Sequence, residues 1–164
     1  APMYQGKIVE VKQEKVIVDM NHPHVDQTVE LAYMVEKIVK PSDFGNNHIE
    51  WLEDFKQGRE ASAGLNRPIL LFLYADWCQY CEKMFSGSFK DPWVNYFKDE
   101  YVWVKINSDQ NKAFMKAFGQ KGFPLTVLMT PDGKILEKWS GYKKSVELRQ
   151  GLIKVLNNYK AIAG

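Results

Sequence analysis

The chain has 164 residues, of which 45% are apolar and 13% aromatic, and this composition predicts a globular core. Its formal net charge is only +2 and Lys and Arg do not gather in one segment, so a nucleic-acid partner is not indicated. No apolar run approaches the roughly 18 residues of a membrane-spanning helix, so no membrane span is expected.

The N-terminal segment, residues 1–40, is predicted to form strands. Apolar and polar residues alternate at 7–11, 15–20 and 28–35, which indicates a small antiparallel β meander. A linker is expected at 41–47, where Pro, Gly and Asn interrupt the pattern. The second part of the chain then runs over residues 48–164.

That second part alternates between helical and strand patterns. A helix is expected from about His48, with four apolar residues on one side: Ile49, Trp51, Leu52 and Phe55. Asp91 and Pro92 are typical of an N-cap and a first helical position. Further strands are expected at 69–75, 101–106, 125–129 and 134–139, and a short helix at 112–118. This order predicts an α/β fold with a mixed central sheet flanked by helices.

Two sets of apolar residues are expected in the core of this fold. One lies on a C-terminal helix capped by Ser145 and consists of Val146, Leu148, Leu152, Val155, Leu156 and Tyr159. The other has helical spacing after Pro92 and consists of Trp93, Tyr96 and Phe97.

Cys78 and Cys81 are the only cysteines, and they lie between the apolar strand at 69–75 and a helical segment. There the first thiol sits at a helix N-terminus, where free N–H groups favour thiolate over thiol. A structural zinc site needs four ligands, but the chain has no second Cys-x-x-Cys and its three histidines all lie upstream. A disulfide across two residues gains little chain entropy as a structural staple. The pair therefore favours a dithiol redox centre, and no metal site is expected, including at His22 and His24.

Several motifs resemble the thioredoxin family, in particular the C-terminal domain of DsbD and related periplasmic proteins. They are Leu73-Tyr74-Ala75-Asp76-Trp77-Cys78 with Cys81, the loop Gly122-Phe123-Pro124-Leu125-Thr126-Val127-Leu128, and Lys105-Ile106-Asn107-Ser108-Asp109. The resemblance implies a thioredoxin fold, thiol–disulfide oxidoreductase activity on protein disulfides and no cofactor. It also implies an extracytoplasmic, periplasmic location, with a cytoplasmic one as the alternative, and an upstream electron donor such as a membrane thiol reductant. The oligomeric state is left open.

The resemblance also implies roles for individual residues. Cys78 is expected to be the exposed, attacking thiolate and Cys81 the buried, resolving thiol. Phe123 and Pro124, the latter in a cis bond, would shape the groove that receives substrate. Trp77 either covers the site or belongs to the core at the strand end.

The sequence departs from the family beneath the cysteines. Phe72 stands where thioredoxins carry a buried carboxylate, so Lys105, which matches the lysine that pairs with it, is expected to lack a partner. Asp76 and Glu82 either substitute for that acid or are ordinary surface residues. Gln79 and Tyr80, between the cysteines, favour a reductase or isomerase over a strong oxidant.

The segment 1–40 resembles the C-terminal part of a SlyD-like FKBP domain, through Val16-Ile17-Val18-Asp19-Met20-Asn21-His22-Pro23 and Thr28-Val29-Glu30-Leu31. Because the other half of such a domain is missing, docking or dimerisation is expected rather than prolyl isomerase activity. Two alternatives to the main interpretation follow. One is a folding helper that binds unfolded protein through these strands, and the other is a cytochrome-biogenesis-type reductase.

Overall fold

A computed structural model describes residues 7–11, 16–19, 48–119 and 122–163 of the chain. The chain divides into two compact units, Ala1–Val39 and Lys40–Gly164. In the first unit, β1 (Lys7–Val11) pairs antiparallel with β2 (Val16–Asp19). The strand expected at 28–35, the linker at 41–47, and His22 and His24 lie outside the described residues. The domain boundary near residue 40 and the FKBP-like meander therefore stay predictions.

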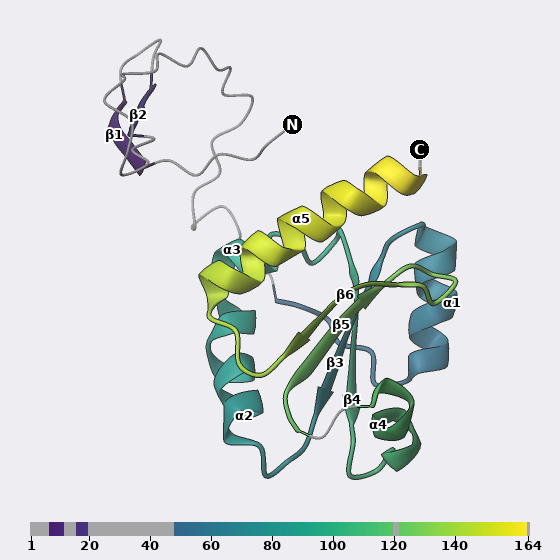
Figure 1. Cartoon of the computed structure of the whole chain (residues 1–164). Coiled ribbons are helices and arrows are strands. Elements are labelled where there is room, and N and C mark those ends of the chain that lie inside the picture. The colour runs from purple at the N-terminus through teal and green to yellow at the C-terminus, as the bar shows by residue number, and fades with distance from the viewer. Residues whose placement is uncertain (1–6, 12–15, 20–47, 120–121, 164) are drawn as a thin grey trace. The chain divides into compact units, whose positions relative to one another are not determined.

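The second unit is built on a four-stranded sheet with the order β4-β3-β5-β6. Its strands are β3 (Ile69–Tyr74), β4 (Val102–Asn107), β5 (Leu125–Met129) and β6 (Ile135–Ser140). β3 runs parallel to β4, whereas β5 is antiparallel to both β3 and β6. The mixed sheet predicted from the sequence is confirmed (Figure 1).

Helices cover both faces of this sheet (Figure 1). They are α1 (Phe55–Leu65), α2 (Gln79–Ser86), the 3-10 helix η2 (Ser88–Lys90), α3 (Pro92–Asn95), α4 (Lys112–Phe118) and α5 (Ser145–Ala163). Two helix ends lie where the capping residues in the sequence indicate them. The Asp91 side chain accepts the Trp93 N–H, and Gly119 ends α4 with a φ of 61°. No helix among the described residues is both long and apolar enough to cross a membrane.

The prediction of a helix from His48 is wrong, because α1 begins only at Phe55. Leu52 instead forms a parallel bridge along the outer edge of β4: its N–H donates to Trp103 O and its carbonyl accepts the Lys105 N–H, both at 2.9 Å. Asp54 then caps α1 by accepting the Gln57 N–H at 2.8 Å. Hydrogen bonds to a distant strand edge thus override the local helical spacing.

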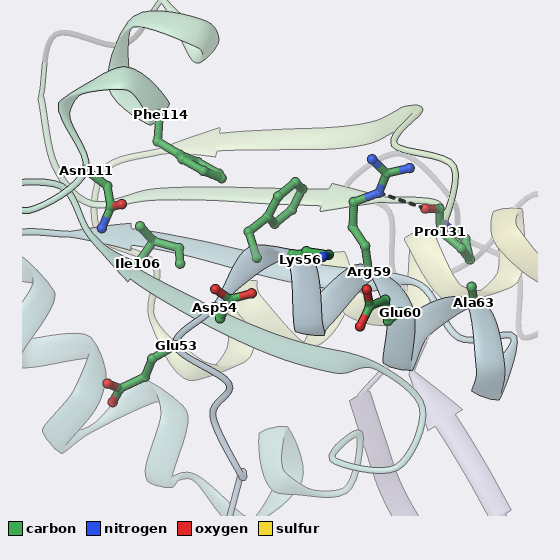
Figure 2. A pocket seen from close by; sticks show the side chains of 11 residues that line it. Glu53, Asp54, Lys56, Arg59, Glu60, Ala63, Ile106, Asn111, Phe114 and Pro131 are labelled. Carbon is green, nitrogen blue, oxygen red and sulfur yellow. Dashed lines mark hydrogen bonds between the residues drawn. The ribbon is translucent and has the colours of Figure 1, made fainter.

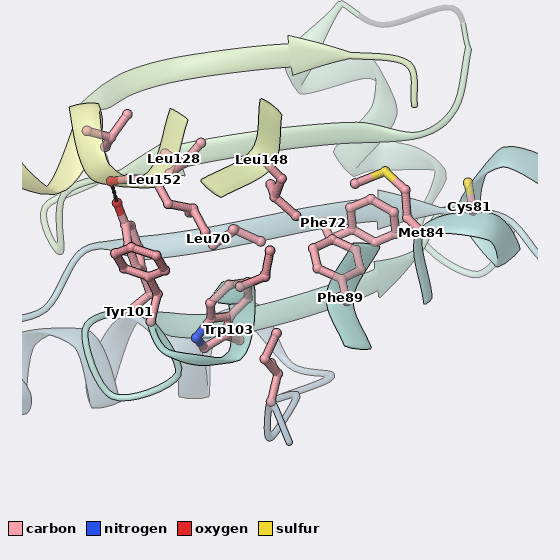
Figure 3. Close-up of a cluster of buried hydrophobic side chains, with 14 of the residues drawn as sticks. Leu70, Phe72, Cys81, Met84, Phe89, Tyr101, Trp103, Leu128, Leu148 and Leu152 are labelled. Carbon is pink, nitrogen blue, oxygen red and sulfur yellow. Dashed lines mark hydrogen bonds between the residues drawn. The ribbon is translucent and has the colours of Figure 1, made fainter. Parts of the chain in front are cut away.

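Alternation along β3 divides the core between the two faces. Ile69, Leu71 and Leu73 pack beneath α1 and α4, whereas Leu70 and Phe72 face α2 and α5. The cluster that contains Leu70 and Phe72 also includes Cys81 and Met84, and Figure 3 shows Met84 beside Phe72. Helix α2, which carries Cys81 and Met84, is therefore anchored on the sheet.

Both of the residue sets that were expected in the core are only partly buried. On α5, Val146 is 55% exposed, whereas the other five members of the stripe are buried. After Pro92, Phe97 is buried, but Trp93 and Tyr96 are exposed. The helical spacing fails here because α3 ends at Asn95, after a single turn. Trp93 instead lies beside Arg149 of α5, whose guanidinium carbon is 5.9 Å from the ring centroid.

Candidate functional site

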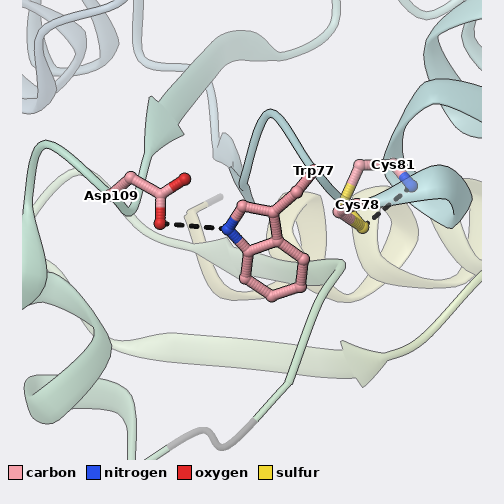
Figure 4. The surroundings of a disulfide bond; sticks show 4 residues. All are labelled: Trp77, Cys78, Cys81 and Asp109. Carbon is pink, nitrogen blue, oxygen red and sulfur yellow. Dashed lines mark hydrogen bonds between the residues drawn. A yellow bond between two sulfur atoms is a disulfide. The ribbon is translucent and has the colours of Figure 1, made fainter.

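The two cysteines lie where β3 ends and α2 begins. Cys78 is the N-cap of α2, and Cys81 is in its first turn. They form a disulfide with a Cα–Cα distance of 5.2 Å, and the Cys81 N–H donates to Cys78 Sγ at 3.1 Å (Figure 4). A backbone donor of the first turn therefore already points at the sulfur on which a thiolate would form, and such a donor stabilises negative charge there.

Cys78 is less exposed than expected. Only 7% of its surface is accessible, compared with 1% for Cys81. The expectation of an exposed Cys78 is corrected, because the disulfide and the Cys81 N–H hold its sulfur against the first turn of α2. The order of accessibility between the two residues is nevertheless the expected one.

Trp77 does not belong to the core, and its role as a cover of the site stays a prediction. Its side chain is 68% exposed, and its indole N–H donates to Asp109 Oδ1 at 3.2 Å (Figure 4). Its ring also meets that of Phe123 edge to face, with centroids 5.6 Å apart. The sequence places Asp109 in a family-like motif but does not predict its contact with Trp77. The available signal was that β3 and β4 are parallel, so that residues just beyond their carboxyl ends meet at one edge of the sheet.

Phe123 and Pro124 lead into β5, beside β3. Pro124 is buried and its bond to Phe123 is cis. The Pro124 carbonyl accepts the N–H of Gly141 at 2.8 Å, which ties this loop to the turn after β6. Gly141 has a φ of +82°, a conformation that favours glycine at this position.

Aromatic rings belong to the same hydrophobic cluster as the two cysteines. Phe72 is fully buried and packs against Trp51, Phe85 and Phe89, with ring centroids 4.9 to 6.2 Å away. These four residues carry no ionisable group. Of these four residues, the sequence analysis connects only Phe72 with the site. Trp51 lies in the segment for which the sequence predicts a helix, so its contact with Phe72 is not expected.

Lys105 has an ion-pair partner, contrary to expectation. Its Nζ lies 2.9 Å from Glu53 Oε1, on the segment that covers the edge of β4, and 5.9 Å from the centroid of Phe85. Asp76 and Glu82 are both exposed, as ordinary surface acids are. The described residues contain no group of three or more His, Cys, Asp or Glu side chains that would hold a metal ion.

A hollow of about 640 Å³ lies along α1 and α4. Figure 2 shows Lys56, Arg59 and Glu60 of α1 on one side of it, with Asn111 and Phe114 on the other. Neither cysteine lines it, and neither do Trp77, Phe123 or Pro124. The redox chemistry is therefore not placed in this hollow.

A mixed sheet, a Cys-x-x-Cys pair at the start of the helix after its central strand and a cis proline before the antiparallel neighbour together define a thioredoxin-like domain. The family model of the thioredoxin-like domain matches residues 55–156, more than half of the chain, and the chain belongs to this family. The resemblance inferred from the sequence is confirmed for this part. The matched residues begin at 55, so the FKBP-like resemblance of 1–40 stays a prediction.

Individual relatives agree with the family. The thiol:disulfide interchange protein DsbD of Pseudoalteromonas atlantica is 31% identical over 87 residues, which cover 51% of this chain but only 15% of that protein. A thioredoxin of Borreliella burgdorferi is 30% identical over 81 residues, 49% of this chain and 68% of that protein. The oxidised C-terminal domain of Neisseria meningitidis DsbD shares the fold, with a TM-score of 0.55 and 21% identity over 64% of this chain and 98% of that domain.

Proposed function

We propose that this chain is a thiol–disulfide oxidoreductase that acts on protein disulfides through Cys78 and Cys81. The observation that carries the proposal is the disulfide at the N-terminus of α2, with a backbone N–H directed at Cys78 Sγ. A bond placed there is favourable for exchange, because the helix end stabilises the thiolate released when the disulfide opens.

In the reducing direction, the Cys78 thiolate attacks one sulfur of a substrate disulfide. A mixed disulfide forms, and the other substrate sulfur leaves as a thiolate that takes up a proton. Cys81, having lost its proton, then attacks Cys78 Sγ and releases the second substrate thiolate, which is protonated in turn. Two electrons pass from the protein dithiol to the substrate, and the Cys78–Cys81 disulfide remains. An upstream thiol donor must then reduce this disulfide.

The surrounding residues support binding of an extended substrate segment next to Cys78. Trp77 and Phe123 form an aromatic wall, and Pro124 removes a backbone donor at the start of β5. The relatives named thiol:disulfide interchange protein support exchange between thiols and disulfides as the chemistry. The proposal includes a reductase or isomerase direction, an extracytoplasmic compartment and a membrane thiol reductant as the electron donor.

The test is catalysed reduction of insulin with dithiothreitol as the electron donor, followed by precipitation of the freed chains. The wild type is expected to accelerate the reaction, whereas Cys78→Ser is expected to fall to the uncatalysed rate. Catalysis that survives Cys78→Ser would contradict the proposal. A folding helper that binds through residues 1–40 would keep its chaperone activity in this variant, so suppression of aggregation by Cys78→Ser separates the two functions.

A further inference from the structure

A second pair of aromatic rings lies beside the disulfide, separate from the pair formed by Trp77 and Phe123. Tyr80, between the two cysteines, is 58% exposed, and its ring centroid lies 6.3 Å from that of the half-buried Tyr142. Tyr142 directly follows Gly141, whose N–H is bound to the Pro124 carbonyl. This hydrogen bond therefore links the Pro124 loop to the segment that carries Tyr142.

A lysine completes this surface. Lys83 Nζ lies 5.8 Å from the centroid of the Tyr142 ring. Lys83 is three residues after Tyr80 on α2, so the two side chains share one side of the helix. We call Tyr80, Lys83 and Tyr142 the cationic arm.

Two further lysines adjoin the arm in the sequence, and the acids nearest to it in the chain are Glu147, Glu82 and Asp76. Lys143 and Lys144 directly follow Tyr142, and the Lys143 carbonyl accepts the Ser88 hydroxyl at 2.6 Å, which anchors this segment to η2. Of the nearby acids, Glu147 already accepts the Lys144 N–H at 3.1 Å. Glu82 is the neighbour of Lys83 and therefore projects about 100° away around α2. Asp76 lies before the cysteines, next to Trp77 in the chain.

We propose that the cationic arm is a specificity determinant that binds an acidic side chain close to the target cysteine of a substrate protein. The proposal rests on the proposed function. Lys83 offers an ammonium group, and the hydroxyls of Tyr80 and Tyr142 offer neutral donors, all of which suit a carboxylate. The exposed Tyr80 ring and the half-buried Tyr142 ring add apolar contact that loses little conformational freedom on binding. The substrate class is therefore proteins whose reactive disulfide is flanked by Asp or Glu.

The experiment uses three synthetic peptides with the same intramolecular disulfide, flanked by Glu, Gln or Lys. Each is mixed with the reduced full chain, the reaction is quenched with acid, and the products are separated by chromatography. Every rate is divided by the rate of the same peptide with dithiothreitol, which removes differences in intrinsic reactivity. The normalised rate is expected to be about twofold to fivefold higher for the Glu peptide than for the Lys peptide at low salt, and this ratio should shrink at 0.5 M salt.

Lys83→Gln should lower the normalised rate of the Glu peptide to that of the Gln peptide without changing the latter, and Lys83→Glu should reverse the preference. Lys56→Gln, on α1 and the opposite face of the sheet, is the matched control and should change nothing. Equal normalised rates for all three peptides, or an equal effect of Lys83→Gln on each, would overturn the specificity while leaving the proposed function intact. If the wild type reduces none of the peptides that dithiothreitol reduces, both proposals fail.

Discussion

Lys105 Nζ lies 2.9 Å from Glu53 Oε1, although Lys105 is paired in register with the buried Phe72 on the neighbouring strand. The ammonium group is therefore neutralised from outside the sheet, by the segment that covers the edge of β4. Aromatic rings, rather than a carboxylate–lysine pair, share the hydrophobic cluster of Cys78 and Cys81. The ion pair and the redox centre are consequently expected to be independent of each other.

Glu53→Gln tests this independence. Because the side chain of Glu53 is 72% exposed and that of Lys105 25% exposed, water screens the pair, and the variant should lose less than about 1 kcal/mol of unfolding free energy. Urea unfolding at low and high salt measures this loss, which should shrink as salt is added. A loss above about 2 kcal/mol, or a large fall in insulin reduction, would instead make Glu53 part of the site.

Phe72→Asp is expected to destabilise the domain strongly. It removes a buried ring, which costs about 3–5 kcal/mol, and places a carboxylate among aromatic side chains while Lys105 is already paired. Phe72→Leu is the control and should cost less than about 1.5 kcal/mol. Both are measured by urea unfolding of the oxidised protein. Wild-type stability of Phe72→Asp would mean that Lys105 leaves Glu53 and pairs with the new acid.

Gly151→Ala is expected to strain the contact between α5 and β6. A Cβ at this position would collide with Trp139 Cζ2, and such overpacking costs about 1–3 kcal/mol. Gly64→Ala on α1 is the matched control, because no atom lies within 4 Å of its Cβ and alanine favours helix by up to about 1 kcal/mol. Thermal unfolding should therefore move in opposite directions for the two variants. A gain in stability for both would show that Trp139 moves aside without cost.

Tyr101 should make stability fall at alkaline pH. Burial, and then the charge of Glu100, raise the pKa of Tyr101 above its ordinary value, so the folded state favours the neutral phenol. Its contribution is fully present below pH of about 10, where the unfolded chain also keeps the proton, and is lost as pH rises further.

The control for this effect is Tyr101→Phe, which also removes the hydrogen bond from the Tyr101 hydroxyl to the Leu152 carbonyl, 2.7 Å long. The variant should lose about 1 kcal/mol at neutral pH but decline less steeply between pH of about 9 and 11. Urea unfolding across this range gives both values. An unchanged alkaline slope in Tyr101→Phe would exclude this residue as the cause.

The features that the sequence predicts correctly are mostly local ones. The helix at 112–118 depends on a glycine that ends it, and α3 depends on Asp91 and Pro92. The features that it misses depend on contacts between distant segments. Leu52 is extended because β4, far along the chain, offers hydrogen-bonding groups at its edge. The contact between Tyr80 and Tyr142 likewise joins residues that no local pattern relates.

The same distinction applies to the site itself. Cys78 and Cys81 could be recognised because their spacing and their place at a strand–helix junction are local. The partners of Trp77 and Lys105, which are Asp109 and Glu53, come from other elements and required the folded sheet. Motifs therefore locate the reacting atoms, whereas tertiary structure determines the charges and rings around them.

The assignment of Cys78 as the attacking thiol and Cys81 as the resolving thiol is tested most directly by trapping the intermediate. Reduced Cys81→Ser and Cys78→Ser are each mixed with oxidised insulin, blocked with an alkylating agent and examined by non-reducing electrophoresis and mass spectrometry. Cys81→Ser should accumulate a mixed disulfide at Cys78, because no resolving thiol remains, and Cys78→Ser should form little adduct. Adducts that form faster through Cys81 than through Cys78, or in neither variant, would contradict the assignment.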